Sequence, residues 1–132
     1  TVREGVKWLP EKNIDVFFVT LNKADKDYSP TTMYNDYSIN ESLFHWQSQS
    51  TTAENSPTGQ RYIHHKERGS KVLLFVREFK SDRVTGGAEA YTYLGTASYV
   101  KHEGSRPMNI TWQLDRPIPA KFLKKTNKLV VG

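Results

Sequence analysis

The chain has 132 residues, with 25% charged and 36% hydrophobic side chains, a formal net charge of +5 and no cysteine. This length fits one globular domain, residues 1–132, and the composition excludes a disordered chain, disulfides, thiolate chemistry and a cysteine zinc site. No apolar run approaches the length of a membrane span and no signal peptide opens the chain, so we expect a soluble, cytoplasmic protein. No cofactor is predicted.

Short strands separated by turn signals account for most of the chain. Residues 2–10 predict an edge strand closed by a proline, and residues 13–21 a strand buried on both faces. Residues 51–59 predict an exposed loop, residues 60–68 a short basic strand, and residues 71–79 a strand in the middle of the sheet. The later elements are a strand at 91–100 with a bulge or close approach at Gly95, a loop at 101–107, a strand at 108–114 and a basic amphipathic helix at 119–128.

Six or seven short strands with little helix predict a mainly β domain with minor α, either a strongly curved sheet or a small barrel. Charge is distributed unevenly along it. Residues 1–70 hold 8 basic and 9 acidic side chains, whereas residues 71–132 hold 11 and 5. This basic C-terminal half favours an anionic partner such as nucleic acid.

Residues 28–50 hold the candidate functional site. They join three tyrosines, a phenylalanine and a tryptophan to amides and hydroxyls, with one aspartate and one glutamate as the only charges. Residues 29–36 predict a turn or one short helix, and residues 43–50 a strand whose alternate side chains from Phe44 face the core. Rings beside hydrogen-bonding groups can stack on a planar polar ligand and read its edge.

Several long segments resemble a domain found at the C-terminus of bacterial proteins that also carry a phospholipase-D-like nuclease and a superfamily 2 helicase. Some proteins of that architecture are ATP-dependent, modification-dependent (type IV) restriction enzymes. The segments that carry the resemblance are residues 18–23, 29–37, 43–49, 59–62, 74–77, 93–95 and 102–112.

The resemblance implies a target-recognition domain for double-stranded DNA that contains 5-methylcytosine or 5-hydroxymethylcytosine. It also implies a fold similar to SET-and-RING-associated (SRA) or PUA-like barrels, bacterial cytoplasm as the location, and helicase and nuclease domains in the same chain as partners. A reader of this kind flips the base into a pocket, and such a pocket requires stacking faces, an acceptor for the N4 amino group and an apolar niche for the methyl.

The candidate pocket residues supply these groups. Asp36 is the predicted acceptor, because a carboxylate pairs with the amino group of cytosine and repels O4 of thymine. The predicted stacking residues are Tyr34, Tyr37 and Trp46. Gln47, Ser48 and Gln49, with nearby backbone N–H groups, would meet either the remaining edge of the base or the flanking bases. The predicted contacts to the DNA backbone, which make affinity sensitive to salt, are Arg61, His64, His65, Lys66, Lys101, His102 and Arg106.

Plainer interpretations of the same residues stay open. The rings can belong to the core, and Asp36 can cap a turn. Adjacent His64 and His65 on a strand would point to opposite faces, so no metal site is predicted. The alternatives for the whole domain are a modification-independent nucleic-acid clamp and a protein-docking module that regulates a helicase. No catalytic residue is predicted, because no triad, phosphate loop or ligand cluster is present in the sequence.

Overall fold

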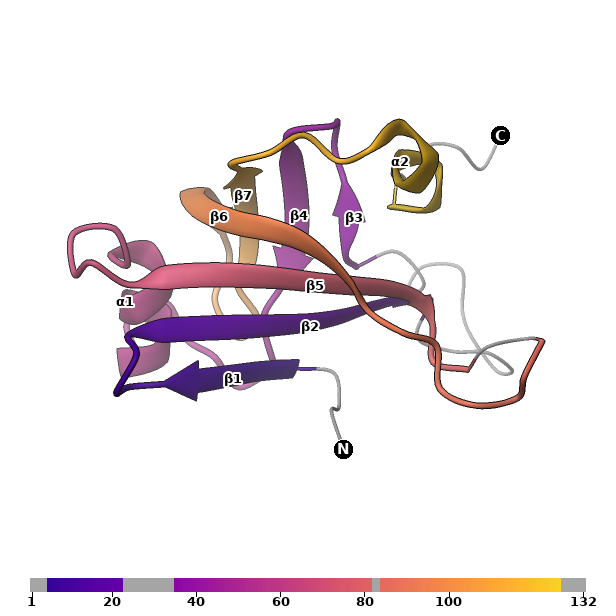
Figure 1. Ribbon diagram of the computed structural model, residues 1–132. Coiled ribbons are helices and arrows are strands. Elements are labelled where there is room, and N and C mark those ends of the chain that lie inside the picture. Colours follow the sequence, from indigo (N-terminus) through magenta and orange to yellow (C-terminus); the bar gives the residue numbers. More distant parts are fainter. Residues whose placement is uncertain (1–4, 23–34, 82–83, 127–132) are drawn as a thin grey trace.

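The computed structural model describes residues 5–22, 35–81 and 84–126. Its elements in chain order are β1 (Gly5–Leu9), β2 (Ile14–Asn22), β3 (Tyr37–Ser38), β4 (Leu43–Gln47), α1 (Pro57–Ile63), β5 (Lys71–Phe79), β6 (Thr92–Glu103), β7 (Asn109–Leu114) and α2 (Ala120–Thr126) (Figure 1). The prediction of a mainly β chain with little helix is confirmed.

All seven strands form one mixed sheet in the order β1-β2-β5-β6-β7-β4-β3. The pair β2 and β5 is parallel, and the other neighbours are antiparallel. Strand β1 lies at an edge and β5 in the interior, as the sequence predicts. Within the described residues the two edge strands, β1 and β3, do not pair with each other, so the sheet is open rather than a closed barrel.

Side chains from distant strands meet on one face of the sheet, here called the inner face. Phe17 on β2 stacks on Trp46 on β4 with ring centroids 4.2 Å apart, although these are the second and sixth strands of the sheet. Phe17 also meets Trp112 on β7 edge to face at 5.3 Å. In Figure 1 strands β3, β4 and β7 run across the direction of β1, β2 and β5. The sheet therefore bends over its core, and Tyr62 of α1 packs into the same ring cluster.

The predicted strand at residues 60–68 is wrong, because this part of the chain begins inside helix α1 and continues as turns. The helix starts at Pro57, and the Ser56 side chain accepts a hydrogen bond from the Gly59 N–H at 3.0 Å. A capping serine followed by proline is a strong helix start. The loop predicted for residues 51–59 therefore ends where α1 begins.

Two further local predictions have different outcomes. The bulge at Gly95 is confirmed: the β5–β6 register shifts there, and Gly95 has a φ of 100°, which a side chain would strain. The prediction that residues 13–21 are buried on both faces is only half right. Phe17 and Val19 on the inner face are buried, but Phe18 on the opposite face is only half-buried.

The predicted C-terminal helix is also observed, as α2, within the part of residues 119–128 that the structure describes. Its apolar residues Phe122 and Leu123 are partly buried against the core, which is the arrangement that the sequence predicts.

Candidate functional site

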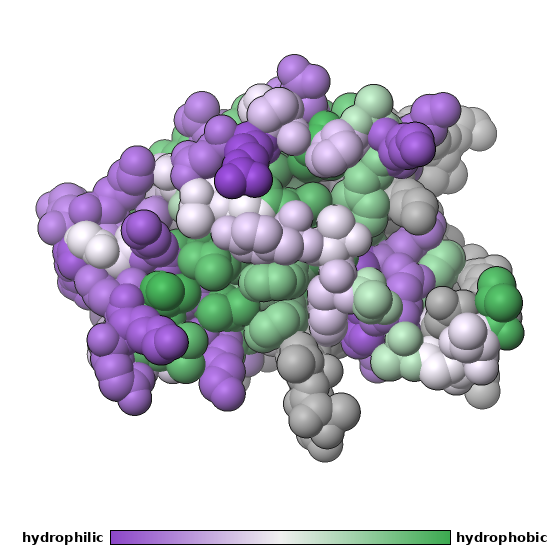
Figure 2. Space-filling model, viewed as in Figure 1, coloured by the Kyte–Doolittle hydropathy of each residue, from purple (hydrophilic) through white to green (hydrophobic). Residues whose placement is uncertain are grey.

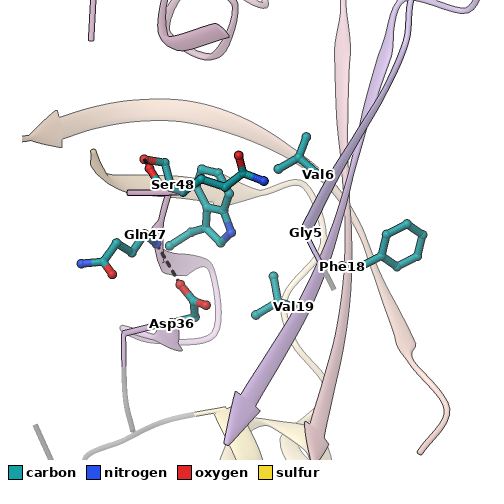
Figure 3. Close-up of a pocket in the computed structure, with 9 residues that line it drawn as sticks. Gly5, Val6, Phe18, Val19, Asp36, Gln47 and Ser48 are labelled. Atoms are coloured by element: carbon teal, nitrogen blue, oxygen red, sulfur yellow. Dashed lines mark hydrogen bonds between the residues drawn. The ribbon is translucent and has the colours of Figure 1, made fainter. Parts of the chain in front are cut away.

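A pocket of about 260 Å³ lies between the β1–β2 edge of the sheet and the end of β4 (Figure 3). Its walls come from Gly5 and Val6 on β1, from Phe18 and Val19 on β2, from Asp36, and from residues 46–49. The volume is slightly below the 300–1,000 Å³ typical of sites for drug-sized ligands, so it suits a smaller group. The bend of the sheet creates this pocket, because it brings β4 opposite β2.

Asp36 is the charged residue among those that line the pocket, and only 2% of its surface is exposed. Tyr37 pairs with His45 in the β3–β4 register, so the next step of that register brings Asp36 beside Trp46. The Asp36 Oδ1 atom accepts a hydrogen bond from the backbone N–H of Gln47 at 2.8 Å. Figure 3 shows this carboxylate between the end of β4 and the side chain of Val19. The sequence-predicted acceptor therefore does lie in a pocket.

Trp46 lines the pocket but belongs mainly to the core. It is 6% exposed, and Phe17 covers one face of its indole ring with an interplanar angle of 26°. The rings of Tyr62 and Trp112 meet it edge to face. Trp46 consequently cannot offer that covered face as the stacking platform that the sequence predicts.

The predicted tyrosines do not complete a ring-lined site. Tyr37 stacks on His45 with centroids 4.7 Å apart, on the side of β4 that faces away from the core, and it does not line the pocket. The ring of His45 is held in turn by the Asn35 carbonyl oxygen, 2.9 Å from Nδ1. Tyr34 lies outside the described residues. Tyr37 therefore lies apart from the pocket that holds Asp36.

Residues 47–49 contribute mainly backbone to the pocket. The Gln47 side chain donates to Asn109 Oδ1 at 3.2 Å and points away from the cavity (Figure 3). The Ser48 hydroxyl donates to the Gln49 carbonyl and accepts from the Met108 N–H at 2.8 Å, which ties β4 to the start of β7. Gln49 is exposed at the rim. Of the three, Gln49 is the one whose side chain is placed to reach a ligand.

Two of the predicted DNA-backbone residues have structural roles. Arg61 forms a bidentate pair with buried Asp15, at 2.8 and 2.9 Å, and its guanidinium lies 4.3 Å from the ring centroid of Trp8. His65 is 2% exposed, and its Nε2 accepts the Tyr99 N–H at 3.0 Å. Burial lowers the pKa of His65, so the imidazole is neutral. His65 is therefore a buried side chain and not one of the surface groups.

Three of the predicted DNA-backbone contacts are exposed at the surface. They are Lys66, Lys101 and Arg106. Arg106 has a φ of 58° in the hairpin between β6 and β7, and its N–H donates to the Thr52 carbonyl at 2.9 Å, so the hairpin is tied to the loop that follows the pocket strand.

Two histidines of the predicted set are paired within the protein. His64 Nδ1 lies 2.8 Å from Glu67 Oε1. His102 joins the Tyr99 hydroxyl to the Glu54 carboxylate, with both distances 2.7 Å. The contact between His102 and Glu54 joins the β6–β7 hairpin to the loop that follows β4. His64 and His102 are both half-exposed.

The β1–β2 wall is the part of the site that sequence reasoning missed. Both Val6 and Val19 line the cavity, and Figure 3 shows Val19 beside the carboxylate and Val6 farther from it, at the level of Ser48. The Phe18 ring points away, and only the main chain beside it borders the cavity. The alternation in β2 puts Val19 on the same face as Phe17. That pattern marks Val19 as core, but it does not reveal that residues 36 and 46–49 lie opposite.

The matched family covers nearly the whole of this structure. A model described as "Domain of unknown function (DUF3427)" matches residues 3–125. The chain belongs to this family. A search of curated proteins found no match. The pocket residues, from Gly5 to Gln49, all lie within the matched range, so the site is part of the family domain and not an appendage.

The described residues contain no helix that is long and apolar enough to cross a membrane. They also contain no group of three or more His, Asp or Glu side chains placed to hold a metal ion.

Proposed function

We propose that this domain is a non-catalytic reader of 5-methylcytosine, or of its 5-hydroxymethyl form, in double-stranded DNA. The observation that supports this most is the buried Asp36 carboxylate in a pocket of about 260 Å³. A base held there must be flipped out of the duplex, because a carboxylate recessed in a pocket cannot reach the edge of a base that remains stacked.

The chemistry of Asp36 favours cytosine over thymine. A carboxylate has about four acceptor positions, so Asp36 can accept from a base amino group as well as from the Gln47 N–H. Cytosine presents the N4 amino donor, whereas thymine presents the O4 acceptor at the same position and would be repelled. A charge-assisted hydrogen bond of this kind contributes about 1.5–3 kcal/mol.

The apolar wall of the pocket suits the methyl group. In 5-methylcytosine the amino group is on C4 and the methyl is on the adjacent C5. When the amino group faces Asp36, the methyl therefore lies close to that carboxylate. Val19 is the apolar side chain there, and Val6 lines the pocket farther from the carboxylate (Figure 3). Burial of one methyl-sized group contributes about 0.8 kcal/mol, or about fourfold in affinity. Methyl discrimination should therefore be modest, with affinity supplied mainly by phosphate contacts.

The exposed cations Lys66, Lys101 and Arg106 are the best candidates for those phosphate contacts. The Arg106 hairpin is tied through Thr52 and Met108 to the segment that carries Ser48 and Gln49. Ionic contacts at this hairpin would therefore lie beside the pocket rim. Binding should weaken steeply as salt increases.

The wider proposal follows from the resemblance in the sequence. It comprises an SRA- or PUA-like fold, a bacterial cytoplasmic location, and an attached helicase and nuclease that the domain directs to modified DNA in restriction. The mainly β chain and the sheet that bends over its core support the fold assignment.

The test is a titration of the domain with three duplexes that differ only in having cytosine, 5-methylcytosine or 5-hydroxymethylcytosine at one position. We expect tighter binding to a modified duplex, and Asp36→Asn should weaken that binding at least about tenfold because the charge-assisted hydrogen bond is lost. Glu11→Gln, which neutralises an exposed carboxylate in the turn between β1 and β2, outside the pocket lining and the β6–β7 hairpin, is the matched control. Circular dichroism should show that both variants remain folded.

Each other outcome identifies one of the alternatives. Equal affinity for all three duplexes, unchanged by Asp36→Asn and strongly dependent on salt, would mean a nucleic-acid clamp without base reading. No binding to any duplex at low salt would leave the protein-docking module as the explanation.

A further inference from the structure

The face of the sheet opposite the core, here called the outer face, carries an uncovered apolar surface. Figure 2, which views this face, shows a continuous hydrophobic area over β2 and β5 with hydrophilic residues around it. The side chains that form it are half-buried, apart from Tyr93, which is 46% exposed. They are Ile14, Val16 and Phe18 on β2, Leu73 and Phe75 on β5, and Tyr93 on β6.

Cross-strand register joins these residues into rows. Phe18 pairs with Phe75, and Phe75 with Tyr93, so three rings line up across three strands. The ring centroids are 5.4 Å apart in the first pair and 4.8 Å in the second. A row of aromatic side chains that pack on one another presents a firm surface to a partner.

The apolar character of this face is unusual for a sheet open to solvent. Strands β2 and β5 are a parallel pair, and both are apolar on their two faces. Parallel strands of this composition normally have both faces covered. Contiguous apolar surface on a soluble protein generally marks an interaction site.

A second row of paired residues, beside the aromatic row, has charged side chains at its two ends, and these charges indicate what covers the face. This row runs from Lys7 through Val16 and Leu73 to Thr96, whose hydroxyl donates to the Asp115 carboxylate. Both Lys7 and Asp115 are exposed. The row thus has a positive end on β1 and a negative end beyond β6, with apolar side chains between them.

A surface of this kind is complementary to itself. A two-fold axis that lies between two facing sheets and runs along the strands reverses the order of the row in the second copy. Lys7 of each copy then faces Asp115 of the other, while the apolar centres meet. We propose that the outer face is the interface of a symmetric dimer of this chain.

The dimer leaves the candidate pocket accessible, because the pocket opens on the inner side of β1 and β2. The proposal is therefore independent of the proposed DNA-reading function, and either one can fail without the other.

Sedimentation equilibrium of the 132-residue chain over a wide range of concentration tests the proposal. We expect a reversible monomer–dimer equilibrium. Phe75→Ser should raise the dimer Kd at least about tenfold, because central interface aromatics contribute most to binding. Tyr93→Ser, at a more exposed position, should act in the same direction with less effect on folding. Val100→Ser is the matched control, since Val100 is 45% exposed but lies outside the rows.

Charge exchange tests the orientation of the two copies. Lys7→Glu alone and Asp115→Lys alone should each weaken the dimer by placing like charges opposite each other, whereas the double variant should restore it. A chain that stays monomeric at every concentration would overturn the proposal and leave the outer face for a different protein. A dimer that is insensitive to Phe75→Ser and Tyr93→Ser would place the interface elsewhere and would also overturn it.

Discussion

Removal of the Arg61 guanidinium should destabilise the fold, and this prediction separates a structural role from a role in DNA binding. Asp15 on β2 is 0% exposed, and Arg61 Nε and Nη2 donate to its two oxygens at 2.8 and 2.9 Å. Arg61→Met keeps an apolar chain of similar length over Trp8 but leaves the carboxylate buried without this partner. Breaking a buried ion pair from one side typically costs about 3–5 kcal/mol.

Urea denaturation followed by tryptophan fluorescence measures this change in the free energy of unfolding. Arg68→Met is the control, since Arg68 is exposed and its side chain should matter by less than about 0.5 kcal/mol. Adding Asp15→Leu to Arg61→Met should restore most of the lost stability, because an apolar pair can replace a buried ion pair. If Arg61→Met unfolds at the wild-type urea concentration but binds DNA more weakly, Arg61 is a DNA contact and the structural reasoning is wrong.

Two further predictions concern stability. Burial lowers the pKa of His65 below its ordinary value of 6.5, so the unfolded chain binds the proton more readily. The free energy of unfolding should be at its full value above about pH 6.5 and should fall as the pH drops through and below 6.5, by up to about 1.4 kcal/mol per pH unit. His65→Gln should flatten this part of the pH profile of urea unfolding, and an unchanged profile would contradict the assignment. Gly59→Ala should destabilise by about 1–3 kcal/mol in thermal unfolding, because the added Cβ would overlap the Ala53 carbonyl oxygen; Gly87→Ala, in an open loop, should have almost no effect.

The strands could be predicted because their signals are local. Residues 71–79 and β5 coincide, and the alternation from Phe44 correctly separates the buried from the half-exposed side of β4. The failure at residues 60–68 has a local cause too. Tyr62 and Ile63 are residue types that favour strands, but Ser56 as N-cap and Pro57 at the first helical position start a helix before them. The same Ser-Pro pair occurs at residues 29–30, where it predicts a turn or one short helix.

The site could be predicted only in the part that is contiguous in sequence. Asp36 and residues 46–49 stand out by composition, and they do line one pocket. The opposite wall, Val6 and Val19, depends on the bend that brings the second and sixth strands together, and no local pattern encodes that bend. The separation of Tyr37 from the pocket was also not visible in the sequence, since it depends on the stacking of Tyr37 on His45, on the side of β4 that faces away from the core.

The parallel pairing of β2 with β5 also bears on how the chain reaches its native state. The pairing of β2 with β5 closes a loop made of residues 23–70, which include β3, β4 and α1. Closing so long a segment is entropically unfavourable, and folding slows as the mean sequence separation of contacts rises. We therefore expect refolding on the scale of milliseconds to seconds, with the β6–β7 hairpin, whose strands are adjacent in sequence, among the earliest structures to form.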